Sequence, residues 1–208
     1  MYVIAIIGQK GGTGKTMVAI ALATQAAKAG FVVMLIDIDP QANAANWKDR
    51  RKADDMVVEA IPAARLAQKL EAARNSGAEI VIIDSPAKND SALMAAARAA
   101  DLVLIPSQRH LVSLETLAAV RDLLNGAGNP QAFVLYNEIH PSATASIADL
   151  KAATADLCGL PPCVLLVFHL IRWRFAQPHP SWDQPTIELR LIACGRRQGA
   201  LLLNSCTQ

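Results

Sequence analysis

Aromatic residues make up only 4% of this 208-residue sequence, no cysteine precedes position 158, and no lysine follows position 151. The longest uninterrupted apolar stretch, near CVLLVF, is far shorter than a membrane span requires. The start MYVIAIIG has neither the basic region nor the small-residue cleavage site of a signal peptide. We therefore expect a cytoplasmic protein.

The four cysteines lie in the last quarter of the chain, and none of them shows CxxC spacing. In a cytoplasmic protein they are expected to be free thiols rather than a disulfide framework or a metal site. The formal net charge of +2 is too small to indicate a nucleic-acid partner by itself, although a local basic patch is compatible with it.

Apolar residues make up 52% of the chain, and they gather in short runs that alternate with helical patterns. The expected strands are 2–7, 31–39, 56–61, 78–86, 101–107 and 131–137. The expected helices are 15–29, 41–52, 62–75, 90–99, 112–126 and 144–157. Nearly continuous apolar strands alternating with helices predict an α/β fold, a mostly parallel twisted sheet with helices on both faces.

The segment KGGTGKT, residues 10–16, lies between the first expected strand and the first expected helix. In this context glycines let backbone N–H groups turn toward a phosphate, and the helix N-terminus adds partial positive charge. Lys15 can then reach the β and γ phosphates, and the Thr16 hydroxyl can ligate Mg²⁺. The general P-loop has glycine where this chain has Gln9. The expected nucleotide-binding residues of the loop are Gly11, Gly12, Thr13, Gly14, Lys15, Thr16 and Met17.

This variant loop resembles the deviant Walker A motif of the ParA/MinD family of P-loop ATPases. The resemblance implies that Lys10 reaches across a nucleotide-sandwich homodimer and contacts the phosphates bound to the other subunit. Charge on the phosphates must be neutralised in the transition state, so a lysine from the partner would make hydrolysis depend on dimerisation. Lys10 and Lys15 are therefore expected to be catalytic. The alternative is that Lys10 is a solvated loop lysine.

Two acidic motifs extend the resemblance. LIDIDPQAN carries the family's DxDPQ pattern, which implies that Asp39 positions the attacking water and approaches the metal through a water. Asp37 would support the loop and the Mg²⁺ shell, although both acids could instead cap their strand. EIVIIDSP resembles the Walker B strand, which implies that Asp84 holds Mg²⁺ through a water. The following SPAKND is the expected switch segment that senses the γ-phosphate.

Two later segments carry weaker expectations. VLIPSQRHL resembles a region near the dimer and partner surfaces, where we expect Arg109 and His110 to be solvated. Asn137 ends a strand where family members often read the adenine edge, but it could equally cap the next turn.

Within the family, the absence of cysteine before position 158 argues against iron–sulfur members. The last residues lack the basic amphipathic helix of MinD-like members, so no stable membrane association is expected. A small plasmid or chromosomal ParA fits best, with ATP or ADP and Mg²⁺ as ligands. Alternatives are a MinD-like membrane-associated positioning ATPase and a nucleotide-binding regulatory module with little turnover.

The ParA resemblance implies that ATP drives dimerisation and binding to DNA without sequence preference, which places the ATP form on the nucleoid. A ParB-like, centromere-binding adaptor would then stimulate hydrolysis. A scattered solvated face is the alternative for the candidate DNA-binding residues, Arg172, Arg174, Arg190, Arg196 and Arg197.

The last segment differs in composition. Lysine disappears after position 151, while cysteine, tryptophan and proline accumulate. We expect one ParA-type domain over 1–208, family-like over 1–157, with a divergent or frameshifted segment over 158–208 that departs from the family from about position 160.

Overall fold

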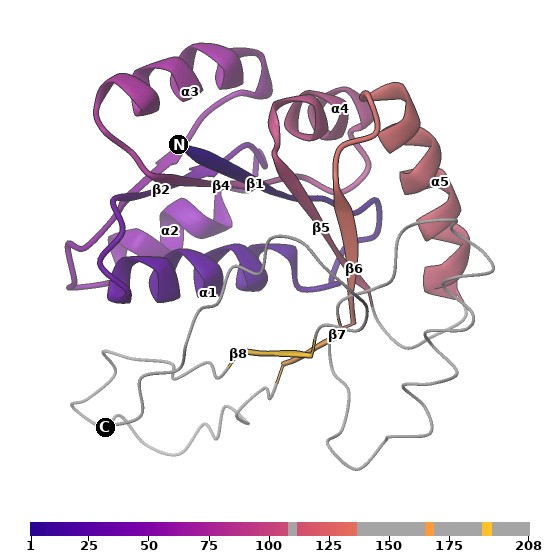
Figure 1. Ribbon diagram of the computed structural model, residues 1–208, viewed down its shortest axis with the longest axis horizontal. Coiled ribbons are helices and arrows are strands. Elements are labelled where there is room, and N and C mark those ends of the chain that lie inside the picture. Colours follow the sequence, from indigo (N-terminus) through magenta and orange to yellow (C-terminus); the bar gives the residue numbers. More distant parts are fainter. Residues whose placement is uncertain (108–111, 137–164, 169–188, 193–208) are drawn as a thin grey trace.

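The computed structural model describes residues 1–107, 112–136, 165–168 and 189–192. Six strands form one parallel sheet in the order β3-β2-β4-β1-β5-β6 (Figure 1). They are β1 Tyr2–Ile6, β2 Val33–Asp37, β3 Val57–Ala60, β4 Ile80–Asp84, β5 Leu102–Ser107 and β6 Ala132–Tyr136. A separate antiparallel pair consists of β7 Leu165–Phe168 and β8 Leu189–Ile192.

Helices cover both faces of the six-stranded sheet (Figure 1). They are α1 Lys15–Lys28, α2 Asn43–Asp49, the 3₁₀ turn η1 Ala63–Arg65, α3 Leu66–Asn75, α4 Asp90–Ala99 and α5 Val112–Gly126. Helices α1 and α2 lie on one face, and α3, α4 and α5 lie on the other. Among the described residues, no helix combines the length and the apolar character that crossing a bilayer requires.

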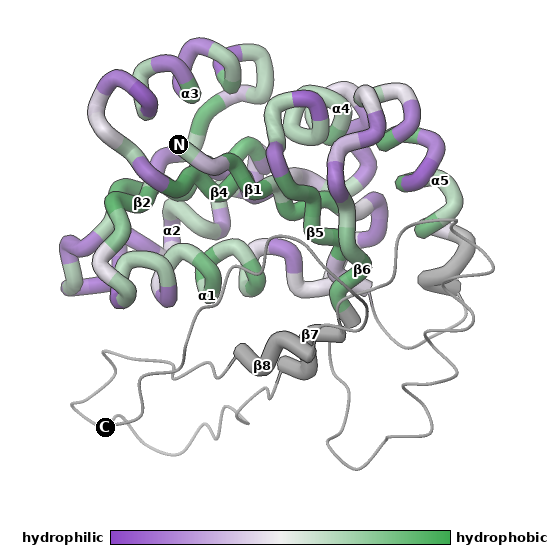
Figure 2. Tube along the Cα trace, viewed as in Figure 1, coloured by the Kyte–Doolittle hydropathy of each residue, from purple (hydrophilic) through white to green (hydrophobic). Residues whose placement is uncertain are grey.

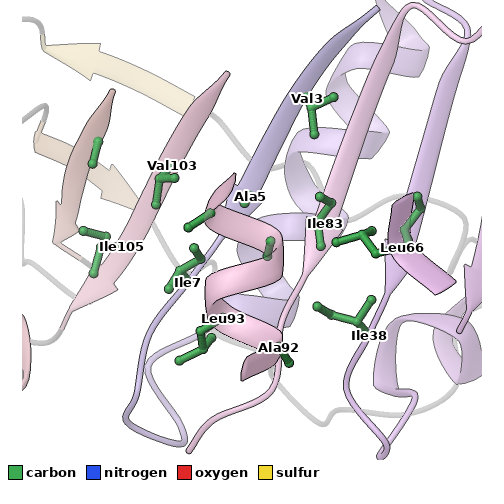
Figure 3. Packing of buried hydrophobic residues seen from close by; sticks show 14 of the residues in the cluster. Val3, Ala5, Ile7, Ile38, Leu66, Ile83, Ala92, Leu93, Val103 and Ile105 are labelled. Atoms are coloured by element: carbon green, nitrogen blue, oxygen red, sulfur yellow. The ribbon is translucent and has the colours of Figure 1, made fainter. Parts of the chain in front are cut away.

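The alternation of side chains along each strand produces two apolar layers. In β1, Ile4 and Ile6 pack in the layer beneath α1, whereas Val3 and Ala5 pack in the layer beneath α3, α4 and α5. Figure 3 shows this second layer, in which Leu93 of α4 lies beside Ile7. Because both faces are covered, every residue of β2 and β4 is buried, and the strands form the apolar centre of Figure 2.

The described elements confirm the predicted α/β fold, and the six-stranded sheet is entirely parallel. The boundaries differ by a few residues: the strand expected at 31–39 covers Val33–Asp37, and the helix expected at 62–75 begins with the turn η1. The helix expected at 144–157 lies outside the described residues.

Candidate functional site

Three neighbouring strands bring the glycine loop and the two acidic motifs of the sequence to one edge of the sheet. Strand β4 lies between β2 and β1, and Asp84 is the register partner of both Asp37 and Ile6. The segment that follows β1 contains the glycine loop. In parallel α/β sheets, ligands bind outside the carboxyl ends of the strands, where the strand order reverses. The loop and both acidic motifs therefore meet where a ligand is expected.

The glycine loop has the backbone conformation that its glycines permit. Gly12 and Gly14 have φ angles of 76° and 92°, which side chains other than glycine rarely allow. Gly14 is the N-cap of α1, no side chain caps this helix, and its first turn carries no acidic residue. The first N–H groups of a helix have no intrahelical partner, so this end of α1 offers donors and positive potential to an anion.

Lys15 lies inside the loop, with only 7% of its surface exposed. Its Nζ donates to the Lys10 carbonyl oxygen at 3.0 Å, and the Thr13 hydroxyl donates to the same oxygen at 3.4 Å. Burial lowers the pKa of Lys15, and the negative charges of Asp84 and Asp39 oppose that shift. A partly desolvated ammonium group therefore faces the anion site and at the same time fixes the backbone at Lys10.

The side chain of Lys10 is half-buried. Within the part of the chain that the structure describes, it makes no ion pair or hydrogen bond. This position is compatible with both expectations for Lys10, a contact with a second subunit and a solvated lysine.

Asp37 is fully buried, and the loop that follows it uses both of its carboxylate oxygens. Oδ1 accepts the Asp39 N–H at 3.0 Å, and Oδ2 accepts the Ala44 N–H at 2.9 Å. Burial raises the pKa of Asp37, while these backbone N–H groups pull it down. Asp37 therefore holds the loop and the start of α2, which matches its expected supporting role.

Asp84 is as deeply buried as Asp37, but among the described residues neither of its carboxylate oxygens has a hydrogen-bond partner. Burial raises its pKa to about 7. The Thr16 side chain lies near enough to lower this pKa somewhat, yet it does not reach hydrogen-bond geometry. A buried carboxylate without partners is costly unless a cation or a water-bound cation approaches it.

The donor set around Asp84 fits a hydrated Mg²⁺. The described residues contain no cluster of three or more His, Cys, Asp or Glu side chains that could hold a metal alone. Mg²⁺ keeps several waters and is usually bound by one or two protein oxygens together with substrate phosphates. The Thr16 hydroxyl and Asp84, through a water, would supply the protein oxygens beside the anion site.

Asp39 lies two residues further along the loop and is half-buried. Its Oδ1 accepts the Gln41 N–H at 3.0 Å, and its charge opposes the lowering of the Lys15 pKa. The fold therefore places this carboxylate within electrostatic range of Lys15, where a group that orients a water would lie.

Three side-chain hydrogen bonds hold the segment after Asp84, and the sequence did not predict them. The Ser85 hydroxyl donates to the Ile6 carbonyl oxygen at 2.6 Å. Asn89 caps α4 by accepting the Ala92 N–H at 3.1 Å. Gln9 Nε2 donates to Asp90 Oδ1 at 3.2 Å. The glutamine at a glycine position of the P-loop marks Gln9 as unusual, but it does not identify Asp90 as its partner.

Several expected site residues cannot be placed. Asn137, Arg109, His110, Arg172, Arg174, Arg196 and Arg197 lie outside the described residues. Arg190 belongs to β8, where its backbone pairs with Val167. Met17, in the first turn of α1, has 42% of its surface exposed.

A glycine loop between β1 and α1, an inward-facing lysine and a buried aspartate at the end of a neighbouring strand define a P-loop nucleotide-binding protein. The sequence profile of the CobQ/CobB/MinD/ParA nucleotide binding domain matches residues 4–177. The chain therefore belongs to this family, the ParA/MinD group of P-loop ATPases, as its motifs indicated.

Individual relatives agree with this assignment. The maintenance of carboxysome distribution protein A of Gloeobacter kilaueensis is 38% identical over 119 residues, which cover 55% of this chain and 53% of that protein. The chromosome partitioning protein ParA of Caulobacter vibrioides is 32% identical over 207 residues, with 75% of this chain and 78% of that protein covered. The chain thus spans between about half and four fifths of the length of these relatives.

The fold itself is shared with solved structures. The MinD cell division protein of Aquifex aeolicus superimposes with a TM-score of 0.65 over 80% of this chain and 82% of that chain. The two sequences are 22% identical, so this likeness concerns the fold.

Proposed function

We propose that the chain is a ParA-type DNA partition ATPase, in which ATP binding drives the closure of two copies and hydrolysis separates them. The observation that carries the proposal is the loop with two lysines, Lys10 and Lys15, beside the carboxylate of Asp84, which has no hydrogen-bond partner in the described part of the chain. The chromosome partitioning protein ParA of Caulobacter vibrioides, which matches three quarters of the chain, supports the choice of partition.

Each residue of the site has a defined task in this proposal. The N–H groups of the loop and of the first turn of α1 bind the phosphates, and Lys15 neutralises charge on them. Thr16 and, through a water, Asp84 would hold Mg²⁺, which when bound would supply further neutralisation of phosphate charge. Asp39 orients the attacking water. Lys10 of the opposite subunit stabilises the charge that develops on the transferred phosphoryl group.

The wider cycle belongs to the same proposal. One domain spanning residues 1–208 would dimerise with ATP in the cytoplasm and bind DNA on the nucleoid without sequence preference. Backbone contacts from arginines such as Arg172 and Arg174 would make that binding strongly salt-dependent. A ParB-like, centromere-binding adaptor would stimulate hydrolysis, and Asn137 would read the adenine edge. The divergent or frameshifted origin of residues 158–208 is a hypothesis separate from this proposal.

The test compares wild type with Lys10→Ala and with a matched control, Lys28→Ala, which removes an exposed lysine at the far end of α1. Nucleotide affinity, ATP hydrolysis and solution mass are measured with Mg²⁺ and ATP or ADP. Binding to a 60-base-pair duplex of arbitrary sequence and to phosphatidylglycerol vesicles is measured in parallel. We expect wild type and Lys28→Ala to dimerise and to bind the duplex with ATP and not with ADP.

Lys10→Ala is expected to retain nucleotide affinity and to lose hydrolysis, because the missing charge acts in the transition state. Full turnover in Lys10→Ala would remove the role of this lysine in the opposite site. ATP-dependent binding to the vesicles instead of the duplex would indicate a MinD-like positioning ATPase. Nucleotide binding without a dimer or turnover would indicate a regulatory module.

A further inference from the structure

Gln9 occupies the position at which the general P-loop has glycine, and the structure shows a contact that requires a side chain there. Its amide Nε2 donates to Asp90 Oδ1 at 3.2 Å across a separation of 81 residues. Asp90 is the first residue of α4. The contact therefore joins the phosphate loop directly to the far end of the segment that begins after Asp84.

The near end of that segment is joined to the same strand. The Ser85 hydroxyl donates to the Ile6 carbonyl oxygen at 2.6 Å, and both groups are buried. Residues 86–89 thus form a span held at each end by a side-chain hydrogen bond to β1 or to the loop that follows it. Inside the span, Lys88 has a φ angle of 62°, a left-handed conformation that is unfavourable for lysine.

The phosphate loop is fixed on its other side by Lys15. The Lys15 Nζ and the Thr13 hydroxyl both contact the Lys10 carbonyl oxygen, and Lys10 directly follows Gln9. Lys15 is also the group that a phosphate would attract. A phosphate that draws Lys15 forward would therefore change the contacts at Lys10 and, through the adjacent residue, the tie to Asp90.

We propose that the Gln9–Asp90 hydrogen bond is a positioning contact that transmits occupancy of the phosphate loop to the span 86–89 and the start of α4. This inference rests on the proposed function, because it names the route by which the nucleotide acts on its own switch segment. Gln9 and Asp90 are positioning residues, since neither is among the groups assigned to the phosphates or the metal.

Gln9 and Asp90 can exchange their amide and carboxylate groups without a change in side-chain length or in the total charge of the pair. Gln9→Glu sets two carboxylates against each other and breaks the tie, whereas Asp90→Asn keeps an oxygen that accepts from Gln9. The double variant Gln9→Glu with Asp90→Asn reverses donor and acceptor and keeps the total charge of wild type. All four proteins are compared in Mg·ADP affinity, urea midpoint, ATP turnover, and hydrogen exchange of residues 85–99 with and without a slowly hydrolysed ATP analogue.

We expect the analogue to slow exchange of residues 85–99 in wild type, Asp90→Asn and the double variant, and to have little effect on it in Gln9→Glu. Turnover in Gln9→Glu is expected to fall by about threefold to tenfold, the range of one ordinary intramolecular hydrogen bond, and to recover in the double variant. The Mg·ADP affinity and the urea midpoint of the three variants are expected to stay close to those of wild type. The reason is that the Gln9–Asp90 hydrogen bond is exposed and neither residue is assigned a contact with the nucleotide.

Two results would overturn the inference while leaving the proposed function intact. The first is wild-type exchange and turnover in Gln9→Glu. The second is a loss in Gln9→Glu that persists in the double variant, which would assign the effect to a charge beside the phosphates. Failure of wild type to bind Mg·ADP or Mg·ATP would instead refute the proposed function, and the inference with it.

Discussion

The loops after β2 and β4 start from equivalent points and are built differently. Both follow a fully buried strand that ends in aspartate, and the two aspartates, Asp37 and Asp84, are register partners. The loop after β2 uses both oxygens of Asp37 to hold its own N–H groups. In the loop after β4, neither oxygen of Asp84 has a hydrogen-bond partner among the residues that the structure describes. Ser85 and Asp90 make the hydrogen bonds that hold this loop instead.

The comparison separates a structural carboxylate from one that is available to a ligand. Burial is nearly the same for the two groups and raises the pKa of both. The two groups differ in hydrogen bonding. Backbone N–H groups satisfy the Asp37 carboxylate, whereas among the described residues the Asp84 carboxylate has no partner and is available to a bound cation or water. Four experiments test this distinction.

The largest effect on stability is expected from Asp37→Ala. It leaves the Asp39 and Ala44 N–H groups without their acceptor, and each buried unsatisfied donor costs about 1–3 kcal/mol. We therefore expect a loss of about 2–4 kcal/mol in the free energy of unfolding. Asp84→Ala, the matched control, breaks no hydrogen bond among the described residues and at pH 8 removes a buried carboxylate, so it should leave the free energy of unfolding unchanged or raise it. Urea denaturation without ligand at pH 8 measures both, and equal losses would contradict the distinction.

The largest effect on ligand binding is expected from Asp84→Asn. A carboxylate that holds a metal through a water typically contributes about 10- to 100-fold in affinity or activity. We expect a loss of that size in nucleotide affinity with Mg²⁺ and little change with EDTA. Asp55→Asn is the control, because Asp55 pairs with Arg51 on an exposed segment. A similar loss with and without Mg²⁺ would show that Asp84 does not act through the metal.

The pH dependence of stability provides a third test. In the folded protein the pKa of Asp84 is raised from 3.8 to about 7, so the native state binds the extra proton over that range. By linkage, this group makes the ligand-free protein less stable as pH rises from about 3.8 to about 7, with no further change above that. Asp84→Asn should flatten the curve of urea midpoint against pH by that contribution. A difference between the two proteins that does not vary with pH would contradict the raised pKa.

The smallest effects are expected from one residue in each loop. Ala42 and Lys88 have φ angles of 49° and 62°, and a left-handed conformation costs a residue with a side chain about 1–2 kcal/mol. After the entropy cost of glycine, Ala42→Gly and Lys88→Gly should each stabilise the protein by about 0.5–1 kcal/mol. The loops should differ in response: Lys88→Gly is expected to weaken the nucleotide-dependent protection of residues 85–99, and Ala42→Gly to leave it unchanged. Identical protection in both variants would argue against a switch at Lys88.

The sequence predicted the elements well because strong local signals agreed with the tertiary packing. The run EIVIIDSP forms a strand buried on both faces, and GGTGKT lies between a strand and a helix in the fold as in the motif. The motifs assigned different roles to Asp37 and Asp84, but the sequence could not predict their hydrogen bonding, because this depends on which N–H groups the folded loops bring to each oxygen. The sequence also could not predict the hydrogen bond between Gln9 and Asp90, because this contact depends on strand order and not on a local pattern.

Strand order also determines the stage of synthesis at which the complete site can form. The phosphate loop and Asp37 are encoded close together, yet β1 and β2 do not pair with each other, because β4 is inserted between them. On a ribosome adding roughly 5–20 residues per second, the first two strands therefore wait for seconds with unmatched edges until Asp84 and its strand emerge. Nascent chains shorter than that lack Asp84 and the strand that joins β1 to β2, so the complete site is expected only after the fourth strand has paired.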